Sequence, residues 1–409
     1  MEIYLVGGAV RDELLGLSVQ ERDWLVVGAS PEQMLELGYK PVGKDFPVFI
    51  HAKTGDEYAL ARTERKSGHG YTGFEFNTDL SVTLEQDLSR RDLTINAIAK
   101  KDEQLFDPYG GVKDLENRIL RHVSHAFVED PLRVLRVARF AARFSTLGFK
   151  IASETRALMA AVVDSGELEH LTPERIWMEI QKALTAQTPS VFFIELRQIN
   201  ALNVIVPEID ALFGVPQTAI HHPEIDTGLH TMMVVDAASK LTEDIEARFA
   251  ALLHDLGKAD TPESEWPRHI KHEQASVIRV RQLCQRLRIP NRLKDTAMLV
   301  ARYHTHCHKA FELRPDTLLN LLEKLDVFRQ KSRLESFLLA CEADARGRTG
   351  FENCDYPQAD FLRRLAEACK QVSSVPLQQQ GLEGKAIGAA LKRERLQTIS
   401  RIKHELLAS

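Results

Sequence analysis

Two acidic residues stand two positions apart near the N-terminus, at the start of an apolar run. In the segment ERDWLVVG, Glu21 and Asp23 open a predicted strand, so their side chains are expected on one face of it. Neighbouring carboxylates repel each other unless a cation lies between them, and Mg²⁺ binds one or two carboxylates together with substrate phosphates. The pair indicates metal-assisted phosphoryl chemistry, with Glu57 in EYALA as a third candidate ligand. Exposed acids before a strand are also common without a metal.

A glycine pair precedes these acids. The run IYLVGGAVRDELLG places Gly7 and Gly8 between an apolar strand and a helix, where backbone N–H groups can approach a phosphate closely. Arg11 would lie in the first turn of that helix, near the same anion. A tight strand-to-helix corner has the same pattern, so the glycines alone leave a structural role open. The sequence lacks the glycine spacing of a dinucleotide fold or a P-loop.

Basic residues gather in two segments further along. In LSRRDLTINAI, Arg90, Arg91 and Asp92 precede Asn96, and adjacent arginines suit bidentate contacts to a triphosphate. The segment RTERKSGHGYTGF is either a mobile loop that closes on an anion or a solvated loop. Its basic residues and glycines are Arg62, Arg65, Lys66, Gly68, Gly70 and Gly73.

One predicted helix carries four arginines on one face. In EDPLRVLRVARFAAR, Asp130 is expected to cap the helix, with Pro131 at its first position. Arg133, Arg136, Arg139 and Arg143 then fall within about one third of the circumference. A solvated face would usually mix arginine with lysine, whereas rigid, planar donors suit bases and phosphates. The face is predicted to bind a nucleotide.

Histidines cluster in the C-terminal third: His221, His222, His230, His254, His269, His272, His304, His306 and His308. In ARFAALLHDLGK, His254 and Asp255 end an apolar helix, and an imidazole and a carboxylate held together suit a divalent metal. His272 and His304 are either further ligands or ordinary polar histidines. His306 and His308 alternate with Cys307 in HTHCH and could form an accidental metal site, but a structural role is favoured.

Length and composition limit the class of protein. The 409 residues imply two to four structural units, and 44% hydrophobic with 27% charged residues is typical of a globular protein. The net charge of −5 gives no sign of a nucleic-acid partner. Five cysteines without CxxC spacing argue against disulfides and a zinc ribbon. The sequence has no signal peptide and no apolar run that could span a bilayer, so we expect a cytoplasmic protein without membrane association.

The elements that position these residues change in type along the chain. Short β-like runs lie at 3–6, 23–27, 47–51 and 57–61, and they predict a small mixed sheet with helices up to about residue 110. From about residue 130, helical spacing dominates, including 130–144, 173–185, 231–241 and 247–258.

Taken together, LVGGAVRD, the acids Glu21 and Asp23, RRDLTINA, DPYGGVKDL and EDPLRVLRVARF resemble the class II tRNA nucleotidyltransferases, or CCA-adding enzymes. LTPERIWMEI is similar to the neck and body helices of that family. The resemblance implies Mg²⁺ at Glu21 and Asp23, where the family usually has Asp at both positions. It further implies nucleotide contacts by Gly7, Gly8, Arg11, Arg91, Asp130, Arg133, Arg136 and Arg139, with Asp130 and Arg133 selecting the base.

Base selection by that pair also follows from chemistry. A carboxylate accepts a hydrogen bond from the amino group of cytosine or adenine, and a guanidinium donates to the neighbouring ring nitrogen. Uracil and guanine would instead point a carbonyl oxygen at Asp130. The pair would therefore leave CTP and ATP as substrates.

In the C-terminal third, His230, His254, Asp255 and Asp344 resemble the H…HD…D pattern of HD-domain phosphohydrolases. This resemblance implies a divalent transition metal, with Ni²⁺ as a candidate, and phosphatase and 2′,3′-cyclic phosphodiesterase activities.

We therefore expect an α+β nucleotidyltransferase head (1–140) with a polymerase-β-like mixed sheet, an all-α neck and body (141–217), and an all-α HD domain with a tail (218–409). The expected function is addition of CCA to tRNA from CTP and ATP, by a monomer or homodimer. Two alternatives stay open: a poly(A) polymerase, and an HD phosphohydrolase whose head only binds nucleotide and regulates.

Overall fold

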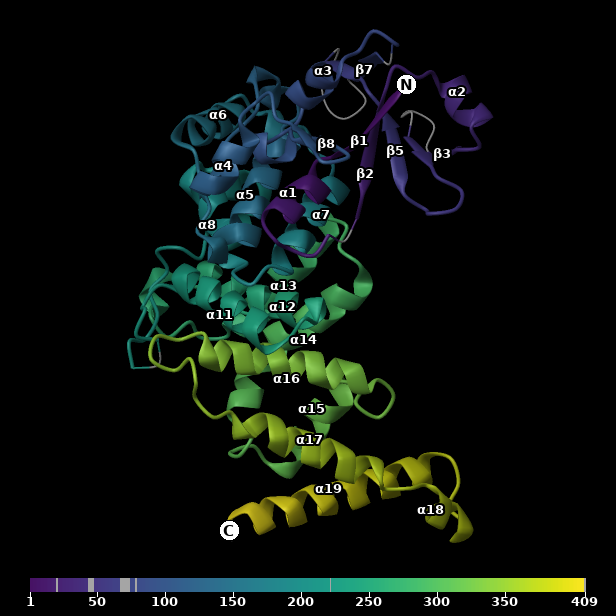
Figure 1. Ribbon diagram of the computed structural model, residues 1–409. Helices are drawn as coiled ribbons and strands as arrows, with labels where there is room; N and C mark the ends of the chain where they lie inside the picture. Colours follow the sequence, from purple (N-terminus) through teal and green to yellow (C-terminus); the bar gives the residue numbers. More distant parts are fainter. Residues whose placement is uncertain (20, 43–47, 67–73, 78, 221, 408–409) are drawn as a thin grey trace. The chain divides into compact units, whose positions relative to one another are not determined.

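The computed structural model describes residues 1–19, 21–42, 48–66, 74–77, 79–220 and 222–407. By their internal contacts, the residues form two compact units. Unit 1 comprises Met1–Ala183 and Val191–Ile205, and unit 2 comprises Leu184–Ser190 and Val206–Ser409. Figure 1 labels their elements. No helix in the described part of the chain is long and apolar enough to cross a membrane.

Unit 1 is built on a mixed sheet of seven strands in the order β3-β4-β5-β2-β1-β8-β9. Neighbours pair antiparallel except β2 and β5, which are parallel. The strands are β1 (Glu2–Val6), β2 (Asp23–Val27), β3 (Lys40–Val42), β4 (Val48–Ile50), β5 (Glu57–Leu60), β8 (Ala99–Lys101) and β9 (Gln104–Phe106). The predicted strands at 3–6, 23–27, 47–51 and 57–61 are thereby confirmed. A separate hairpin joins β6 (Thr63–Lys66) to β7 (Phe74–Asn77), and β10 (Ile119–Leu120) pairs with β11 (Lys150–Ile151).

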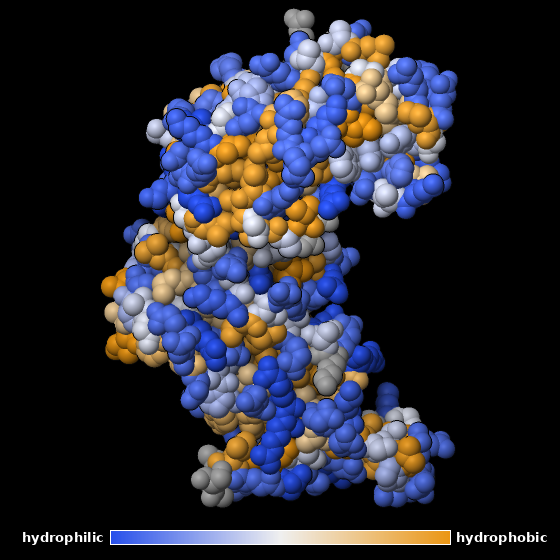
Figure 2. Space-filling model, in the orientation of Figure 1, coloured by the Kyte–Doolittle hydropathy of each residue, from blue (hydrophilic) through white to orange (hydrophobic). Residues whose placement is uncertain are grey.

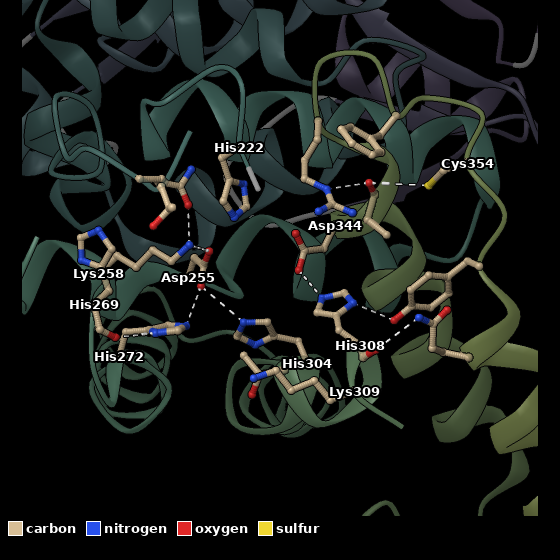
Figure 3. Close-up of a pocket in the computed structure, with 18 of the residues that line it drawn as sticks. His222, Asp255, Lys258, His269, His272, His304, His308, Lys309, Asp344 and Cys354 are labelled. Carbon is tan, nitrogen blue, oxygen red and sulfur yellow. Dashed lines mark hydrogen bonds and ion pairs between the residues drawn. The ribbon is translucent and has the colours of Figure 1, made fainter. Parts of the chain in front are cut away.

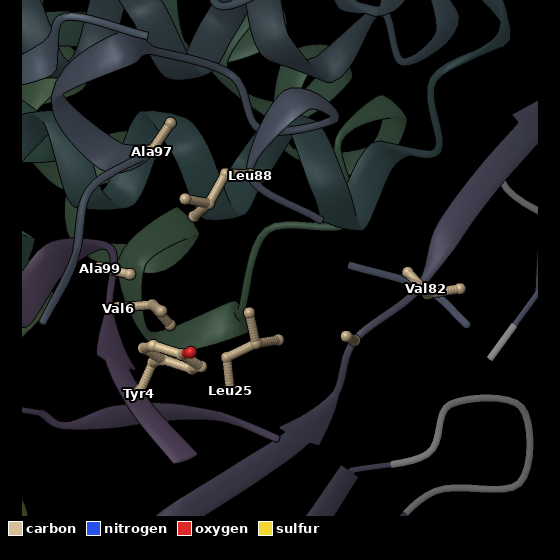
Figure 4. Close-up of a cluster of buried hydrophobic side chains, with 8 residues drawn as sticks. Tyr4, Val6, Leu25, Val82, Leu88, Ala97 and Ala99 are labelled. Carbon is tan, nitrogen blue, oxygen red and sulfur yellow. The ribbon is translucent and has the colours of Figure 1, made fainter. Parts of the chain in front are cut away.

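The helices named for unit 1 are α1 (Gly8–Leu14), α2 (Pro31–Glu36), α3 (Leu84–Ser89), α4 (Gly111–Asn117), α5 (Leu132–Phe144), α6 (Ser153–Asp164), α7 (Pro173–Leu184), α8 (Ser190–Gln198) and α9 (Ala201–Ile205). One core cluster joins the sheet to α3 and the segment after it, with Tyr4, Val6, Leu25 and Leu88 among its members (Figure 4). Burial of these apolar side chains fixes the end of β1 against the segment that carries Arg90 and Arg91.

Helices joined by loops make up unit 2, and its described residues hold no strand beyond one isolated bridge, Pro216 to Asp226. Its helices are α10 (Pro207–Asp210), α11 (Thr227–Leu241), α12 (Ile245–Leu253), α13 (His272–Arg286), α14 (Asn291–His308), α15 (Pro315–Lys324), α16 (Lys331–Arg346), α17 (Pro357–Lys370), α18 (Val375–Gln379) and α19 (Lys385–Leu407). Gly257, just after α12, has no room for a side chain, because a Cβ there would lie 2.2 Å from the Ser276 nitrogen. The glycine lets the turn after His254 and Asp255 pack directly on α13.

The α+β head and all-α remainder confirm the predicted fold class. One local boundary differs. Helix α5 begins at Leu132, and its N-cap residue is Pro131. Asp130, the predicted cap, therefore stands one position before the observed one. Its Oδ1 still accepts the Leu132 backbone N–H at 3.1 Å, so the carboxylate performs the capping bond from that position. The exposed face drawn in Figure 2 is largely hydrophilic with scattered hydrophobic areas.

Candidate active sites

Sheet register brings the glycine turn and the acids of unit 1 together. Val6 is opposite Asp23 in the β1–β2 pair, so Gly7 and Gly8 follow directly beside the start of β2. On the other side, Asp23 is in register with Glu57 of β5. Residues in register on neighbouring strands share a face, so these two carboxylates lie on the same side of the sheet. Glu21 is exposed and lies outside the strand.

Gly7 is required by the geometry of this turn. Its φ is +69°, and a Cβ there would lie 2.8 Å from Nη1 of Arg91. Arg91 donates from that nitrogen to the Asn96 carbonyl at 3.3 Å, and Arg11 donates to the Asn96 Oδ1 at 2.5 Å. The two arginines therefore flank the glycine turn.

A cavity of about 540 Å³ opens over this turn, and nine arginines and three aspartates line it. A chain with a net charge of −5 therefore holds a locally basic pocket. Of the ten head residues predicted from the sequence, Glu21 alone is not among the lining residues. The lining set includes Gly7, Gly8, Arg11, Asp23, Arg62, Arg90, Arg91, Asp92, Asn96, Asp130, Arg133, Arg136, Arg139, Arg143 and Arg175.

Buried acids hold the arginines of α5 in place. Nε of Arg136 donates to Asp92 at 2.7 Å, and Nε of Arg139 donates to Glu179 at 2.5 Å. Burial would raise the pKa of Asp92, but the charge of Arg136 and hydrogen bonds from Asn96 and Arg136 outweigh it and lower that pKa. The predicted arginine face is thus an ordered set of donors.

Asp130 and Arg133 line the same pocket, and the Arg133 backbone N–H donates to the Asp130 carbonyl at 3.0 Å, while their side chains have other partners. Arg175, on α7, donates to Asp130 at 2.8 and 3.0 Å, whereas Arg133 donates to the carbonyls of Ala126 and Arg90 at 2.6 Å each. Sequence reasoning missed Arg175, although it stands in the quoted motif LTPERIWMEI. Nothing local in the sequence connects that motif with Asp130.

The charges around Asp23 act on its pKa in opposite directions. Burial and the charge of Glu21 raise the pKa of Asp23, while Arg91 lowers it. Within the basic glycine-rich segment, Gly68, Gly70 and Gly73 lie outside the described residues, and Arg65 and Lys66 belong to β6.

Unit 2 holds a second cavity, of about 690 Å³, around the histidine cluster (Figure 3). His230, His254 and Asp344 place one ligand atom each within 4.8 Å of one another, and all three are buried. Nε2 of His230 lies 3.1 Å from Asp344 Oδ1, and Nε2 of His254 lies 3.7 Å from the same oxygen. The structure therefore brings together three of the four predicted HD-site residues around one point.

Asp255, the fourth, connects this group to a second one. Its Oδ2 lies 3.0 Å from His254 Nε2, and its Oδ1 lies 3.2 Å from His272 Nε2 and 3.5 Å from His304 Nε2. Asp255, His272 and His304 form their own group of ligand atoms within 4.8 Å. His272 and His304, left open from the sequence, thus face the cluster.

These donors fit a metal by an independent criterion. Nε2 of His254, Oδ1 of Asp255 and Nε2 of His272 are buried, and none has a hydrogen-bond partner of acceptable geometry in the described structure. Buried polar atoms are normally satisfied, so three such atoms on side chains that meet at Asp255 fit a bound cation. Burial lowers the pKa of His254, but Asp255 and Asp344 outweigh it and raise that pKa to about 9.

His308, for which the sequence favoured a structural role, contacts one of the predicted metal ligands. Its Nε2 lies 2.7 Å from Asp344 Oδ2, and its Nδ1 shares a 2.9 Å hydrogen bond with the Tyr356 hydroxyl. His306 is not among the residues that line this cavity. Glu224, which sequence reasoning also missed, lies 3.0 Å from His230 Nδ1, so it orients the ring as a carboxylate next to a metal-binding histidine does. His221 lies outside the described residues.

Comparison with known proteins finds three family models that match successive parts of the chain. The model of the poly A polymerase head domain matches residues 3–121, a probable RNA- and SrmB-binding site of polymerase A matches 148–213, and the HD domain matches 227–330. The fold and the sites thus define a protein that joins a nucleotidyltransferase head to an HD domain.

Curated relatives narrow this class. The chain is 58% identical to the multifunctional CCA protein of Thioalkalivibrio sulfidiphilus over 406 residues, and 56% identical to that of Pseudomonas aeruginosa over 406 residues, covering 99% of each chain in both cases. The chain belongs to the multifunctional CCA protein family, which confirms the resemblance noted from its motifs.

Solved structures show the same fold. An apo CCA-adding enzyme matches with a TM-score of 0.64 at 21% identity, covering 99% of this chain and 91% of that one. The Bacillus stearothermophilus CCA-adding enzyme in complex with CTP matches with a TM-score of 0.63 at 22% identity, covering 100% and 95%.

Proposed function

We propose that this chain adds the 3′-terminal CCA to tRNA from CTP and ATP without a nucleic-acid template, releasing pyrophosphate. The observation that carries the proposal is the cavity of unit 1, where nine arginines surround a glycine turn beside Asp23. The relatives named multifunctional CCA proteins support the same reaction. We assign residues 1–140 to the head, 141–217 to the neck and body, and 218–409 to the HD domain and tail.

The arginines would bind and orient the nucleotide. Arg11 and Arg91 flank the glycine turn and would hold the triphosphate, while Arg136 and Arg139, fixed by Asp92 and Glu179, would complete its contacts. Donors that are already ordered raise the affinity of the protein for the nucleotide, because less side-chain freedom is lost when it binds.

Asp130 would select the base. Its oxygens can accept from the amino group of cytosine or adenine, and the two hydrogen bonds from Arg175 orient the carboxylate. Arg133 would supply the accompanying donor after giving up one of its two carbonyl partners. UTP and GTP would present an oxygen to the Asp130 carboxylate and be rejected.

Glu21 and Asp23 are the proposed Mg²⁺ ligands, with Glu57 in register beside Asp23. Bound there, Mg²⁺ would polarise the α-phosphate and stabilise the developing charge on pyrophosphate as the RNA 3′-hydroxyl displaces it. Asp23 and Glu57 lie on the same side of the sheet, next to the glycine turn, and this placement supports the ligand set.

For unit 2 we propose phosphatase and 2′,3′-cyclic phosphodiesterase activity with a divalent transition metal, Ni²⁺ being one candidate. His230, His254, Asp255 and Asp344 would hold the metal, which supplies a bound water of lowered pKa. Water adds to phosphorus and one ring P–O bond breaks, so a cyclic phosphate becomes a monoester with one freed hydroxyl. Lys258, 2.6 Å from Asp255 Oδ2, would lie close to the phosphate.

The decisive test is incorporation of each labelled nucleotide, singly and in mixtures, into tRNA that lacks its 3′ CCA. Ordered addition of C, C and A is expected. Runs of A alone would favour a poly(A) polymerase, and absence of incorporation would favour an HD phosphohydrolase with a regulatory head.

A further inference from the structure

A second hollow, of about 400 Å³, adjoins the metal-site cavity of unit 2. Arg268, His269, His272, Thr305 and Lys309 line both hollows. His272 faces Asp255 from the N-terminus of α13, and Thr305 and Lys309 stand at the C-terminal end of α14. A ligand seated at the metal site can therefore continue into this second hollow, which we call the side groove.

The side groove is basic. Arg268, Lys271 and Lys309 are exposed, and none of them forms an ion pair with a described residue. Lys271 directly precedes His272, and Lys309 (labelled in Figure 3) directly follows His308. Lys271 and Lys309 are thus each adjacent in sequence to a histidine that faces a metal-site carboxylate, one at the start of α13 and one at the end of α14.

Its single lining carboxylate is already engaged. Glu273 accepts a hydrogen bond from the Thr305 hydroxyl at 3.0 Å, and burial of this group is outweighed by His272 and nearby donors, which lower its pKa. Ile270, with 54% of its surface exposed, adds an apolar contact in the same groove. Unpaired cations around an apolar side chain match the alternation of phosphates and sugars or bases in a single nucleic-acid strand.

We propose that the side groove binds the sugar–phosphate backbone of an RNA strand whose 3′-terminal phosphate occupies the metal site. This rests on the proposed phosphodiesterase function and adds its substrate class: a polynucleotide end in preference to a mononucleotide. Lys271 and Lys309 contact the phosphates that precede the terminal nucleotide. A free nucleotide places its only phosphate at the metal site and leaves the groove unused.

The test compares two substrates of the metal-loaded full-length protein: cytidine 2′,3′-cyclic phosphate and a trinucleotide that ends in the same cyclic phosphate. For the natural sequence we expect a KM for the trinucleotide about tenfold lower. Because each phosphate contact on a single strand changes the slope of log affinity against log salt by about 0.7, two contacts predict a slope about 1.4 steeper for the trinucleotide.

The variant Lys271→Ala/Lys309→Ala should reduce the KM preference to about twofold and remove the extra salt dependence. Lys324 and Lys370 are exposed lysines of unit 2 that line neither hollow, so the variant Lys324→Ala/Lys370→Ala is the matched control and should keep both. Equal KM values for the two substrates in the natural sequence would overturn the proposal. So would a lysine variant that keeps the preference.

A second measurement separates the groove from the activity. The trinucleotide should protect Lys271 and Lys309 from an amine-acetylating reagent, read by mass spectrometry, whereas the mononucleotide should not. If neither substrate is hydrolysed but protection is seen, the phosphodiesterase function fails and the groove stands. Hydrolysis of both substrates without protection would refute the groove alone.

Discussion

Replacement of Asp92 by Asn tests whether a buried acid positions the nucleotide-binding arginines. Asp92 Oδ1 accepts from the Leu93 backbone and the Asn96 amide, and Oδ2 accepts from Arg136 at 2.7 Å. Asparagine can keep the first two bonds, but its amide N–H would then face the Arg136 donor. A charge-assisted hydrogen bond is worth about 1.5–3 kcal/mol, so we expect a loss of about 2 kcal/mol of unfolding free energy.

The same change should release Arg136 from its place in the cavity. We expect kcat/KM for CTP to fall about tenfold, which corresponds to about 1.4 kcal/mol. Unfolding of unit 1 can be followed in urea by fluorescence of Trp24 and Trp177 in a Trp266→Phe background, since Trp266 is the only tryptophan of unit 2.

Asp114→Asn is the matched control. Asp114 is also buried, and its partner Arg121 has the same exposed fraction as Arg136, 36% of the side chain in both. Neither Asp114 nor Arg121 lines the nucleotide cavity. The control should lose comparable stability and keep its kcat/KM. If Asp92→Asn leaves kcat/KM unchanged, or if Asp114→Asn lowers it equally, the positioning argument is wrong.

The contribution of Asp92 to the free energy of unfolding should depend on pH in one direction. Because the folded-state pKa of Asp92 is lowered, its contribution to stability is complete above the unfolded value of about 3.9 and is lost as pH falls below it. The stability difference between the natural protein and Asp92→Asn should therefore shrink below about pH 4 and stay constant from about pH 5 to 8.

Three further predictions concern the two units. Asp130→Asn places an amide donor where uracil presents an oxygen, so UTP incorporation relative to CTP should rise about tenfold in single-nucleotide assays; unchanged selectivity would remove Asp130 from base selection. Gly257→Ala forces a Cβ within 2.2 Å of the Ser276 nitrogen and should destabilise unit 2 by at least about 2 kcal/mol, seen in Trp266 fluorescence, with nucleotide addition retained; an unaltered midpoint would contradict the packing. Binding of tRNA should weaken linearly in log Kd with log salt, by about 0.9 per phosphate contact, and a salt-independent Kd would exclude the arginine cavity as its anchor.

Local signals predicted much of this architecture. Short β-like apolar runs predicted the central strands, and helical spacing predicted the arginine face of α5. Spacing along one element says nothing about partners on another, so the bond between Asp130 and Arg175 could not be predicted. The position of His308 beside the cluster could have been predicted, because His304 and His308 stand four apart on α14 and share a face. His306 does not lie on that face. The alternation of His306, Cys307 and His308 in HTHCH does not by itself indicate the four-residue spacing of His304 and His308.

The central claim is that one chain carries two independent active sites. It is tested most directly by measuring both activities in Asp23→Ala and in Asp255→Ala: CCA addition to truncated tRNA, and hydrolysis of a 2′,3′-cyclic phosphate. We expect Asp23→Ala to abolish nucleotide addition and keep hydrolysis. Asp255→Ala should abolish hydrolysis and keep nucleotide addition. Loss of both activities in either correctly folded variant would contradict it.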